Sequence, residues 1–267
     1  MRTFTIAQTW MHKLGLPLLL ATSAMLTASP ALAQAPPSIK TLGVFSLLGD
    51  GLQLVYPTDV TDTRLDRNQR ESLPTKDIGF DQAALRAVRE ALASTQPQAS
   101  MQMFRSNTVM EPAAQRALAE GAAKAELPAW IVGTIQPAKL SHILLITRNR
   151  GEANFPLLSG HSIGRGTIEG IGYYVDRGTE IKNLDTGLTS LGFLGAYAML
   201  RLQLMDANTG DMLASQDVRV GEIYAGRNDK EIGNIWEALG PREKVEVLRK
   251  MVQDNVARVM STVLAGR

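Results

Sequence analysis

Hydrophobic and polar residues alternate most clearly in the stretch of chain from residue 196 to residue 220. Every second residue from 198 to 204 is aliphatic and the residues between are mixed, which is the period of a strand with two unlike faces. Residues 206–211 then supply Asp, Asn, Thr and Gly, which are typical of tight turns. Alternation resumes from 212 to 220. The pattern predicts a long antiparallel hairpin that organises a sheet and carries no chemistry itself.

Shorter apolar runs predict further strands at residues 41–48, 52–56, 101–105, 130–135, 143–147 and 168–175. The first two runs flank Gly49-Asp50-Gly51, so we expect them to form an N-terminal hairpin. Three stretches without a clear period, residues 58–79, 148–166 and 176–191, are predicted to be connecting loops.

Apolar residues three and four apart predict helices. One covers residues 81–94 with Asp81 as its N-cap, an Ala-rich one covers 113–125, and a short one lies within 228–238. The strongest begins at Gly240-Pro241 and carries an apolar stripe that includes Val252 and Val256. Five of the six stripe residues are Val, which has modest helix propensity, so this helix needs a packing surface. We expect Val252 and Val256 to be buried against the hairpin.

The order of these elements predicts the fold class. Helices and strands are interleaved early, strands cluster later, and a helix closes the chain. This order favours an α/β fold with a mixed, largely antiparallel sheet and helices packed on it. We predict a single domain over residues 41–267, preceded by a flexible leader at residues 34–40.

The first 33 residues have the pattern of a secretory signal peptide. Arg2 and Lys13 precede a short apolar run, and Ala31 and Ala33 occupy the small-residue positions before a cleavage site after Ala33. No later run approaches the roughly 20 apolar residues of a membrane helix. We therefore expect an exported periplasmic protein without a transmembrane segment in the mature chain.

The charge balance and the absence of cysteine exclude several classes of function for this protein. The chain has 28 Lys and Arg against 26 Asp and Glu, and the signal segment removes two bases and no acid. The balanced mature chain has no general attraction to nucleic acid. The absence of Cys excludes disulfides, thiolate metal sites and lipid attachment through Cys. The sequence also offers no metal-ligand pattern, so we expect no metal and no cofactor.

The sharpest chemical motif is Gly160-His161-Ser162-Ile163-Gly164, which matches the G-x-S-x-G pattern of serine hydrolases. In those enzymes Ser lies between a strand and a helix, with a His base later in the chain. Here no His follows Ser162, and the next eight residues hold three glycines. A flexible loop that matches by chance explains the motif better, and a hydrolase using Ser162 is kept as the alternative.

Three segments together resemble a family of envelope proteins. They are the opening strand at residues 41–45, a strand ending in Gly after a helix at residues 131–133, and an Asp-x-x-Thr-Gly hairpin before the last helix at residues 204–213. They resemble the family of the curli-assembly lipoprotein, the penicillin-binding-protein activators and the N-terminal domain of TolB. This chain departs from the family in lacking the lipid-bearing Cys and in its long connections. The resemblance implies an assembly, scaffold or binding role without a catalytic centre.

These observations lead to one functional prediction. We expect a non-catalytic protein that binds or scaffolds a cell-envelope protein or a peptidoglycan-associated partner, in an oligomeric state that the sequence leaves open. The glycine-rich region 148–191 is the predicted partner surface, because binding residues concentrate on loops held by a rigid scaffold. Its candidate residues are Arg148, Arg165, Glu169, Tyr173, Tyr174 and Asp176.

Overall fold

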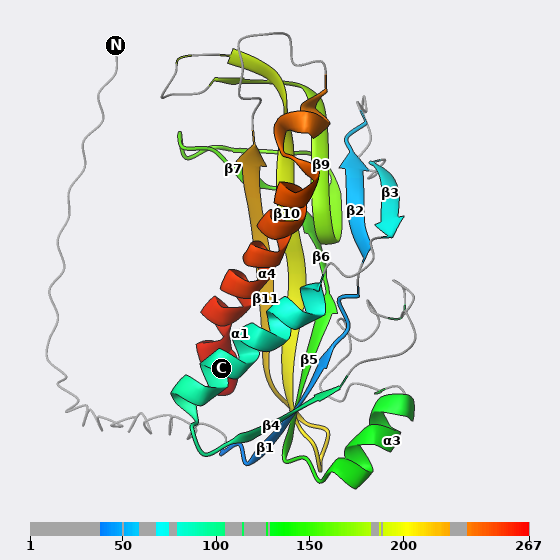
Figure 1. Cartoon of the computed structure of the whole chain (residues 1–267), viewed down its shortest axis with the longest axis vertical. Coiled ribbons are helices and arrows are strands. Elements are labelled where there is room, and N and C mark those ends of the chain that lie inside the picture. Colours follow the sequence, from blue (N-terminus) through cyan, green and yellow to red (C-terminus); the bar gives the residue numbers. More distant parts are fainter. Residues whose placement is uncertain are drawn as a thin grey trace, which may run out of the picture. The chain divides into compact units, whose positions relative to one another are not determined.

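The computed structural model describes residues 38–49, 51–58, 68–74, 79–104, 114, 127, 129–182, 187, 189–224 and 234–266 (Figure 1). The predicted signal peptide and most of the leader lie outside these residues, as do most of the expected 113–125 helix and residues 228–233. The domain boundaries stay predictions. Within the described part, the chain forms a mixed sheet, mostly antiparallel, with helices packed on it, which confirms the predicted fold class.

The predicted hairpin is present and longer than expected. Strand β10 (Thr189–Asp206) pairs with β11 (Met212–Tyr224) from Leu194 to Met205. The turn follows its sequence chemistry: the Asp206 carboxylate accepts from the backbone N–H of Asn208 and Thr209 at 2.7 and 3.0 Å. These hydrogen bonds help to hold the pKa of Asp206 below its ordinary value.

The other edge of β10 is divided between two strands. Its first half, up to Met199, pairs with β9 (Thr167–Lys182), and its second half, from Leu200, pairs with β5 (His142–Arg148). The sheet therefore splits into two arms that share β10. One arm continues from β9 to β2 (Gly51–Tyr56) and β3 (Gln69–Pro74), and the other from β5 to β1 (Thr41–Ser46) and β4 (Ser100–Phe104).

The predicted N-terminal hairpin is wrong. Strand β1 runs parallel to β5 and β2 runs parallel to β9, while β5 and β9 are both antiparallel to β10. Strands β1 and β2 therefore point in the same direction and lie in different arms (Figure 1). The segment around Gly49, which joins β1 to β2, crosses from one arm to the other without reversing the direction of the chain. It is called the step here. Local turn chemistry could not distinguish this step from a reversal.

Helices α1 (Phe80–Thr95) and α4 (Pro241–Leu264) lie together on one face of the sheet (Figure 1). Val252 and Val256 are fully buried in the same core cluster as Leu200, Leu202 and Leu204, as predicted. The N-cap prediction for α1 is wrong, because the helix begins after Gly79 and Asp81 lies in its first turn. A 3₁₀ helix, η1 (Ile235–Ala238), precedes α4, with Asn234 as its N-cap.

Helix α3 (Ala129–Ala138) replaces a predicted strand on the opposite face. Ile131 packs with Phe45 and Leu145, and Trp130 lies edge-on to the Phe45 ring at 5.9 Å. A short apolar run is compatible with a strand or a helix, and this segment reaches the sheet with residues on one side of a helix. The correction also removes the strand at residues 131–133 from the family resemblance, whereas the 204–213 hairpin is confirmed.

The predicted loop at 148–166 is instead an ordered excursion between β5 and β9, called the flap here (residues 149–166). It contains β6 (Arg150–Glu152), which pairs with β9, and the small hairpin of β7 (Phe155–Pro156) and β8 (Ser162–Ile163). The expected loop at 176–191 is largely taken up by the extended ends of β9 and β10. Tertiary pairing therefore orders glycine-rich sequence that has no period of its own.

Candidate functional site

The two arms meet where β5 ends and β9 begins, and Arg148 is the residue at this junction. Its Nε donates to the Leu48 carbonyl at 2.7 Å and its Nη2 donates to the Gly51 carbonyl at 2.6 Å. The guanidinium thus binds both sides of the step between β1 and β2. Gly170 gives it room, since a Cβ there would lie 2.8 Å from Arg148 Cδ. The backbone at Gly170 also has φ of 69°, which favours glycine.

The same step is held by Asp81, from helix α1. Its carboxylate accepts from the Ser46 hydroxyl and from the N–H groups of Leu48 and Gly49, the last two at 3.0 and 3.2 Å. An arginine and an aspartate therefore satisfy the backbone groups that the interrupted ladder leaves open. Sequence reasoning assigned Asp81 to helix capping and missed this role, because the acceptor and its donors are more than 30 positions apart.

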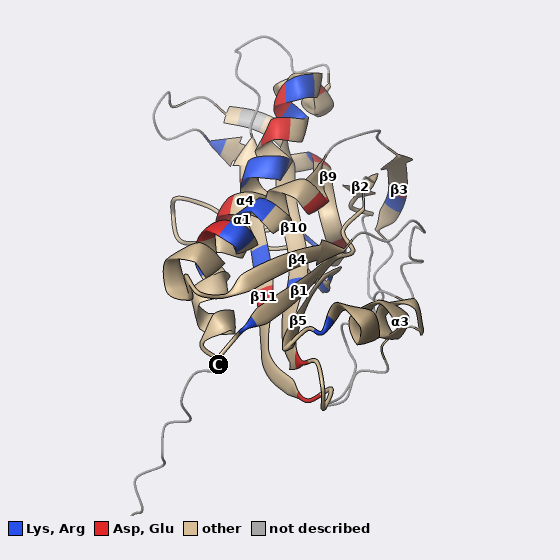
Figure 2. Ribbon diagram, turned by 60° about the horizontal axis from the view of Figure 1, so that its bottom comes forward, with Lys and Arg blue, Asp and Glu red and all other residues tan. Residues whose placement is uncertain are grey.

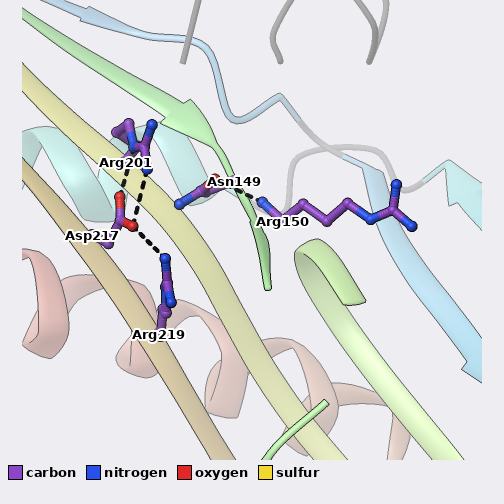
Figure 3. Close-up of polar contacts among 5 residues, drawn as sticks. All are labelled: Asn149, Arg150, Arg201, Asp217 and Arg219. Carbon is purple, nitrogen blue, oxygen red and sulfur yellow. Dashed lines mark hydrogen bonds and ion pairs between the residues drawn. The ribbon is translucent and has the colours of Figure 1, made fainter. Parts of the chain in front are cut away.

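A belt of polar side chains follows the sheet from the junction, on the face opposite α1 and α4. Arg201 on β10 donates through Nε and Nη2 to Asp217 on β11, at 2.6 and 3.0 Å, and Arg219 donates to the same carboxylate at 2.7 Å. Figure 3 shows this network with Asn149 beside it and Arg150 pointing away. Burial alone would raise the pKa of Asp217, but the hydrogen bonds from both arginines outweigh it and lower the pKa.

Several atoms of this region are buried without a hydrogen-bond partner among the residues that the structure describes. They are Thr147 Oγ1, Asn149 Nδ2, Gln203 Oε1, Tyr197 OH and Gln53 Oε1. Burial raises the pKa of Tyr197, although the nearby Arg148 and Arg70 oppose this shift. Ordered water commonly satisfies such groups. The junction and the belt position strands, and within the belt the Asp217 carboxylate forms ion pairs with Arg201 and Arg219.

The structure distributes the predicted partner-binding residues over both faces of the sheet. Tyr173 is fully buried in the α1–α4 core, where its hydroxyl donates to the Lys244 carbonyl at 2.7 Å. Tyr174 is fully buried on the opposite face, where its hydroxyl contacts the backbone of Arg165. The two rings thus lie on opposite faces, as adjacent strand residues should, and both belong to the core.

The charged members of the predicted set are also dispersed. Asp176 is 7% exposed and binds within its own turn, accepting from the N–H groups of Gly178 and Thr179. Glu169 is 9% exposed and pairs across the ladder with Arg150, while Arg148 is half-buried at the junction. Arg165 alone is exposed, on the flap. These residues therefore form no single surface. Within the predicted region, exposed residues remain on the flap and also at the ends of β9 and β10, where Arg177, Glu180 and Leu191 are exposed.

Ser162 lacks the setting of a hydrolase nucleophile. It lies in the two-residue strand β8, which pairs with β7 in a hairpin, and β9 follows within a few residues. A nucleophile elbow needs a sharp turn from a strand into a helix. Ser162 and His161 are both exposed at this hairpin. The G-x-S-x-G match therefore arises from a glycine-containing turn.

The flap is anchored by Phe155, which is fully buried. Its ring fills the space left by Gly195 and Gly221, where an added Cβ would come within 2.5 and 2.8 Å of ring atoms. Tyr174 and Phe193 pack on the same ring, with centroids at 5.2 and 5.6 Å. At the tip, by contrast, Leu158 is 88% exposed. Sequence reasoning missed Leu158, although an apolar residue next to Ser159 and Gly160 was an available signal.

One further cluster surrounds Lys244, at the start of α4. Its Nζ donates to the Leu239 carbonyl and lies 4.3 Å from the centroid of the Trp236 ring, which in turn packs edge-on to Tyr173 at 5.6 Å. Burial lowers the pKa of Lys244, while Glu237 and Glu243 oppose this shift. The ammonium is thus enclosed by an aromatic ring and a carbonyl, an arrangement that ties η1 to α4.

The described residues contain no group of three or more His, Cys, Asp or Glu residues placed to hold a metal ion. None of the helices in the described ranges is long and apolar enough to cross a membrane.

Comparison with known proteins gives structural matches at low sequence identity. No protein-family model matches the sequence, and no curated protein does either. Among solved structures, the protein XCC0632 from Xanthomonas campestris, of family DUF330, matches with a TM-score of 0.36 and 9% identity, covering 89% of both chains. PelC from Paraburkholderia phytofirmans, described as a dodecamer, matches at 0.31 with 11% identity, covering 87% of this chain and 94% of that one. The lipoprotein GNA1162 from Neisseria meningitidis matches at 0.26 with 12% identity, covering 82% and 99%. The narrower family named from the sequence stays a prediction.

Proposed function

We propose that this chain is an exported, non-catalytic protein of the cell envelope that binds or scaffolds a partner through its flap. The partner is an envelope protein or a peptidoglycan-associated protein. The observation that carries the proposal is the contrast within the flap between a fully buried anchor, Phe155, and a tip residue, Leu158, that is 88% exposed.

The construction of the flap supports this role. Ala153 donates its N–H to the Gly166 carbonyl at 2.9 Å, and Leu157 donates to the His161 carbonyl at 2.7 Å. The hairpin is therefore held at its base and across its two strands. Because the flap is already ordered in this way, it loses little conformational entropy when a partner binds to it. A large apolar side chain at its tip suits a pocket on another protein.

Two substitutions would test the flap. Leu158→Asp places a charge at the tip, and Val132→Asp places one on α3, where Val132 is 40% exposed and lies outside the flap. Proteins captured from an envelope extract by the unchanged chain should be lost with Leu158→Asp and retained with Val132→Asp. Capture of the same proteins by Leu158→Asp would contradict a role for the tip.

The non-catalytic part of the proposal has its own test. A fluorophosphonate probe should leave the purified protein unlabelled, since Ser162 has no elbow and no base following it in the chain. Stoichiometric labelling that disappears in Ser162→Ala would identify a serine hydrolase and overturn the proposal.

Export is supported by the sequence of the first 33 residues. We expect periplasmic material to begin at Gln34 when its mass is measured. A full-length mass in the membrane fraction would contradict both the cleavage site and the periplasmic location.

A further inference from the structure

Outer strands of the described sheet differ in how they are protected against pairing with another chain. Strand β3 carries Arg70, Glu71 and Pro74, and β11 carries Asp217, Arg219 and Glu222. Charges and prolines on an edge prevent strand addition. Strand β4 has the sequence Ser-Met-Gln-Met-Phe, with no charge and no proline, and Figure 2 shows it uncoloured by either charge.

Strand β4 has no strand partner on its outer side within the described ranges. It pairs with β1 alone among the described strands, and Ser100, Gln102 and Met103 are exposed, Met103 by 47%. Helix α3 lies beside it, since Gln102 Nε2 donates to the Ala138 carbonyl at 3.4 Å. This helix also carries no charge, and Ile131 is its only buried residue. The β4 edge thus exposes apolar groups and has no charged residue of its own, and the Arg89 guanidinium of α1 contacts it by donating through Nη2 to Met103 Sδ at 3.2 Å.

The hydrogen bonds of β4 determine which backbone groups face outward. Ser100 donates its N–H to the Lys40 carbonyl of the strand entering β1, at 2.9 Å. Because backbone groups alternate in direction along a strand, Ser100, Gln102 and Phe104 bond toward β1. The N–H and C=O groups of Met101 and Met103 therefore point away from the sheet. These four groups are two donors and two acceptors, spaced for an antiparallel partner.

We propose that β4 pairs with β4 of a second copy of this chain, antiparallel and about a two-fold axis through Gln102. In this register Met101 lies opposite the partner's Met103, and the outward groups of both residues make four hydrogen bonds across the axis. Gln102 lies opposite its own copy, and Ser100 lies opposite the partner's Phe104. The strand is complementary to itself because Met faces Met, Gln faces Gln and Ser faces Phe, and the strand carries no charge that would repel its copy.

This interface is separate from the flap, so it does not rest on the proposed partner binding. Five residues a side bury less than the area of a standard interface, and the borders of α1 and α3 add to it. We therefore expect a dimer that forms with increasing concentration. Sedimentation of the full chain should show monomer and dimer in equilibrium, and a monomer at every concentration up to the solubility limit would overturn the proposal.

The register has a direct test, because the chain has no cysteine of its own. In Gln102→Cys the two thiols would meet across the axis, at a non-hydrogen-bonded pair whose Cβ atoms lie about 4.5–5.5 Å apart. In the control Ser100→Cys, two residues along the same face, the thiols would lie roughly 13 Å apart. Under oxidation Gln102→Cys should give at least about tenfold more covalent dimer than Ser100→Cys. Equal yields from both variants would reject this pairing.

A third variant separates pairing from folding. Met103→Pro removes an N–H that points outward and leaves the ladder to β1 intact, whereas Met103→Leu keeps this N–H and a side chain of similar size. Met103→Pro should abolish the dimer while its circular dichroism stays that of the unchanged protein, and Met103→Leu should retain the dimer. A dimer that persists in folded Met103→Pro would contradict the proposal, and if this variant fails to fold, the two cysteine variants still decide it.

Discussion

Arg148 and Leu48 are 100 positions apart in the sequence, yet Arg148 Nε donates to the Leu48 carbonyl at 2.7 Å. Through this hydrogen bond and the one to Gly51, a side chain at the end of β5 holds the step between β1 and β2. The relationship explains how one sheet divides into two arms without leaving those two carbonyls of the step unsatisfied. We therefore expect the stabilising effect of Arg148 to depend more on the shape of its guanidinium group than on its positive charge.

Arg148→Lys should therefore lower the free energy of unfolding, although the positive charge is retained. A planar guanidinium reaches two carbonyls at once, whereas an ammonium on a flexible stem does not reproduce this geometry. We expect a loss of about 1–3 kcal/mol in urea unfolding, because one buried carbonyl loses its donor. Arg150→Lys is the matched control, since Arg150 is exposed and binds the Thr167 hydroxyl at the edge of the flap. An equal loss of unfolding free energy in both variants would show that Arg148 stabilises the protein no more than an exposed arginine does.

Val252 and Val256 on α4 are fully buried against the hairpin. Replacing either by Ala should cost about 1–3 kcal/mol, as for other buried aliphatic residues. Val259, on the same helix, is only half-buried, so Val259→Ala should cost less. Thermal unfolding checks all three. If Val256→Ala kept its melting temperature but lost a dimer or a partner complex, α4 would be an interface rather than a packing element.

Gly195 is expected to tolerate no side chain, because a Cβ there would lie 2.5 Å from the Phe155 ring. Gly195→Ala should displace the ring or the strand and destabilise the protein by about 1–3 kcal/mol through overpacking. Gly178 has open space around it and serves as the control, where Ala should cost little. The two variants can be compared by urea unfolding, with near-ultraviolet circular dichroism reporting on the Phe155, Tyr174 and Phe193 cluster. Unchanged stability of Gly195→Ala would show that the flap is not anchored by Phe155.

His142 should make the stability depend on pH. Burial lowers the pKa of its imidazole, although the nearby Asp206 carboxylate opposes this shift. The unfolded chain therefore binds a proton more readily than the folded protein does. The contribution to stability is complete above the ordinary histidine pKa of about 6.5 and is lost as the pH falls toward the lowered value.

Urea unfolding at about pH 7.5 and pH 5.5 checks this prediction. The unchanged protein should be less stable at the lower pH, and His142→Gln should show a smaller difference between the two. His161→Gln, at an exposed position on the flap, should behave like the unchanged protein. A pH dependence that is the same in His142→Gln would assign the effect to other groups.

Local pattern was sufficient wherever an element carries its own period. The hairpin of β10 and β11, helices α1 and α4, and the burial of Val252 and Val256 follow from alternation or from a helical stripe. In these segments the residues that the core needs are spaced at the period of the element, so sequence and structure agree. The Asp-x-x-Thr-Gly turn belongs to the same group, because Asp206 bonds to backbone only two and three residues away.

Tertiary structure decided the elements whose partners are distant. The step between β1 and β2 looks locally like a turn, but β1 and β2 run in the same direction because they pair in parallel with two different strands, β5 and β9. The run at 130–135 suits a strand or a helix, and the position of Phe45 and Leu145 selects a helix. Glu169, Tyr173 and Tyr174 lie in the predicted strand at 168–175 and Asp176 directly follows it, but their burial depends on the pairing of β9 and on the packing over both of its faces. The exposure of each candidate partner-binding residue therefore could not be predicted from the sequence. It depends on strand pairing between segments that are far apart along the chain.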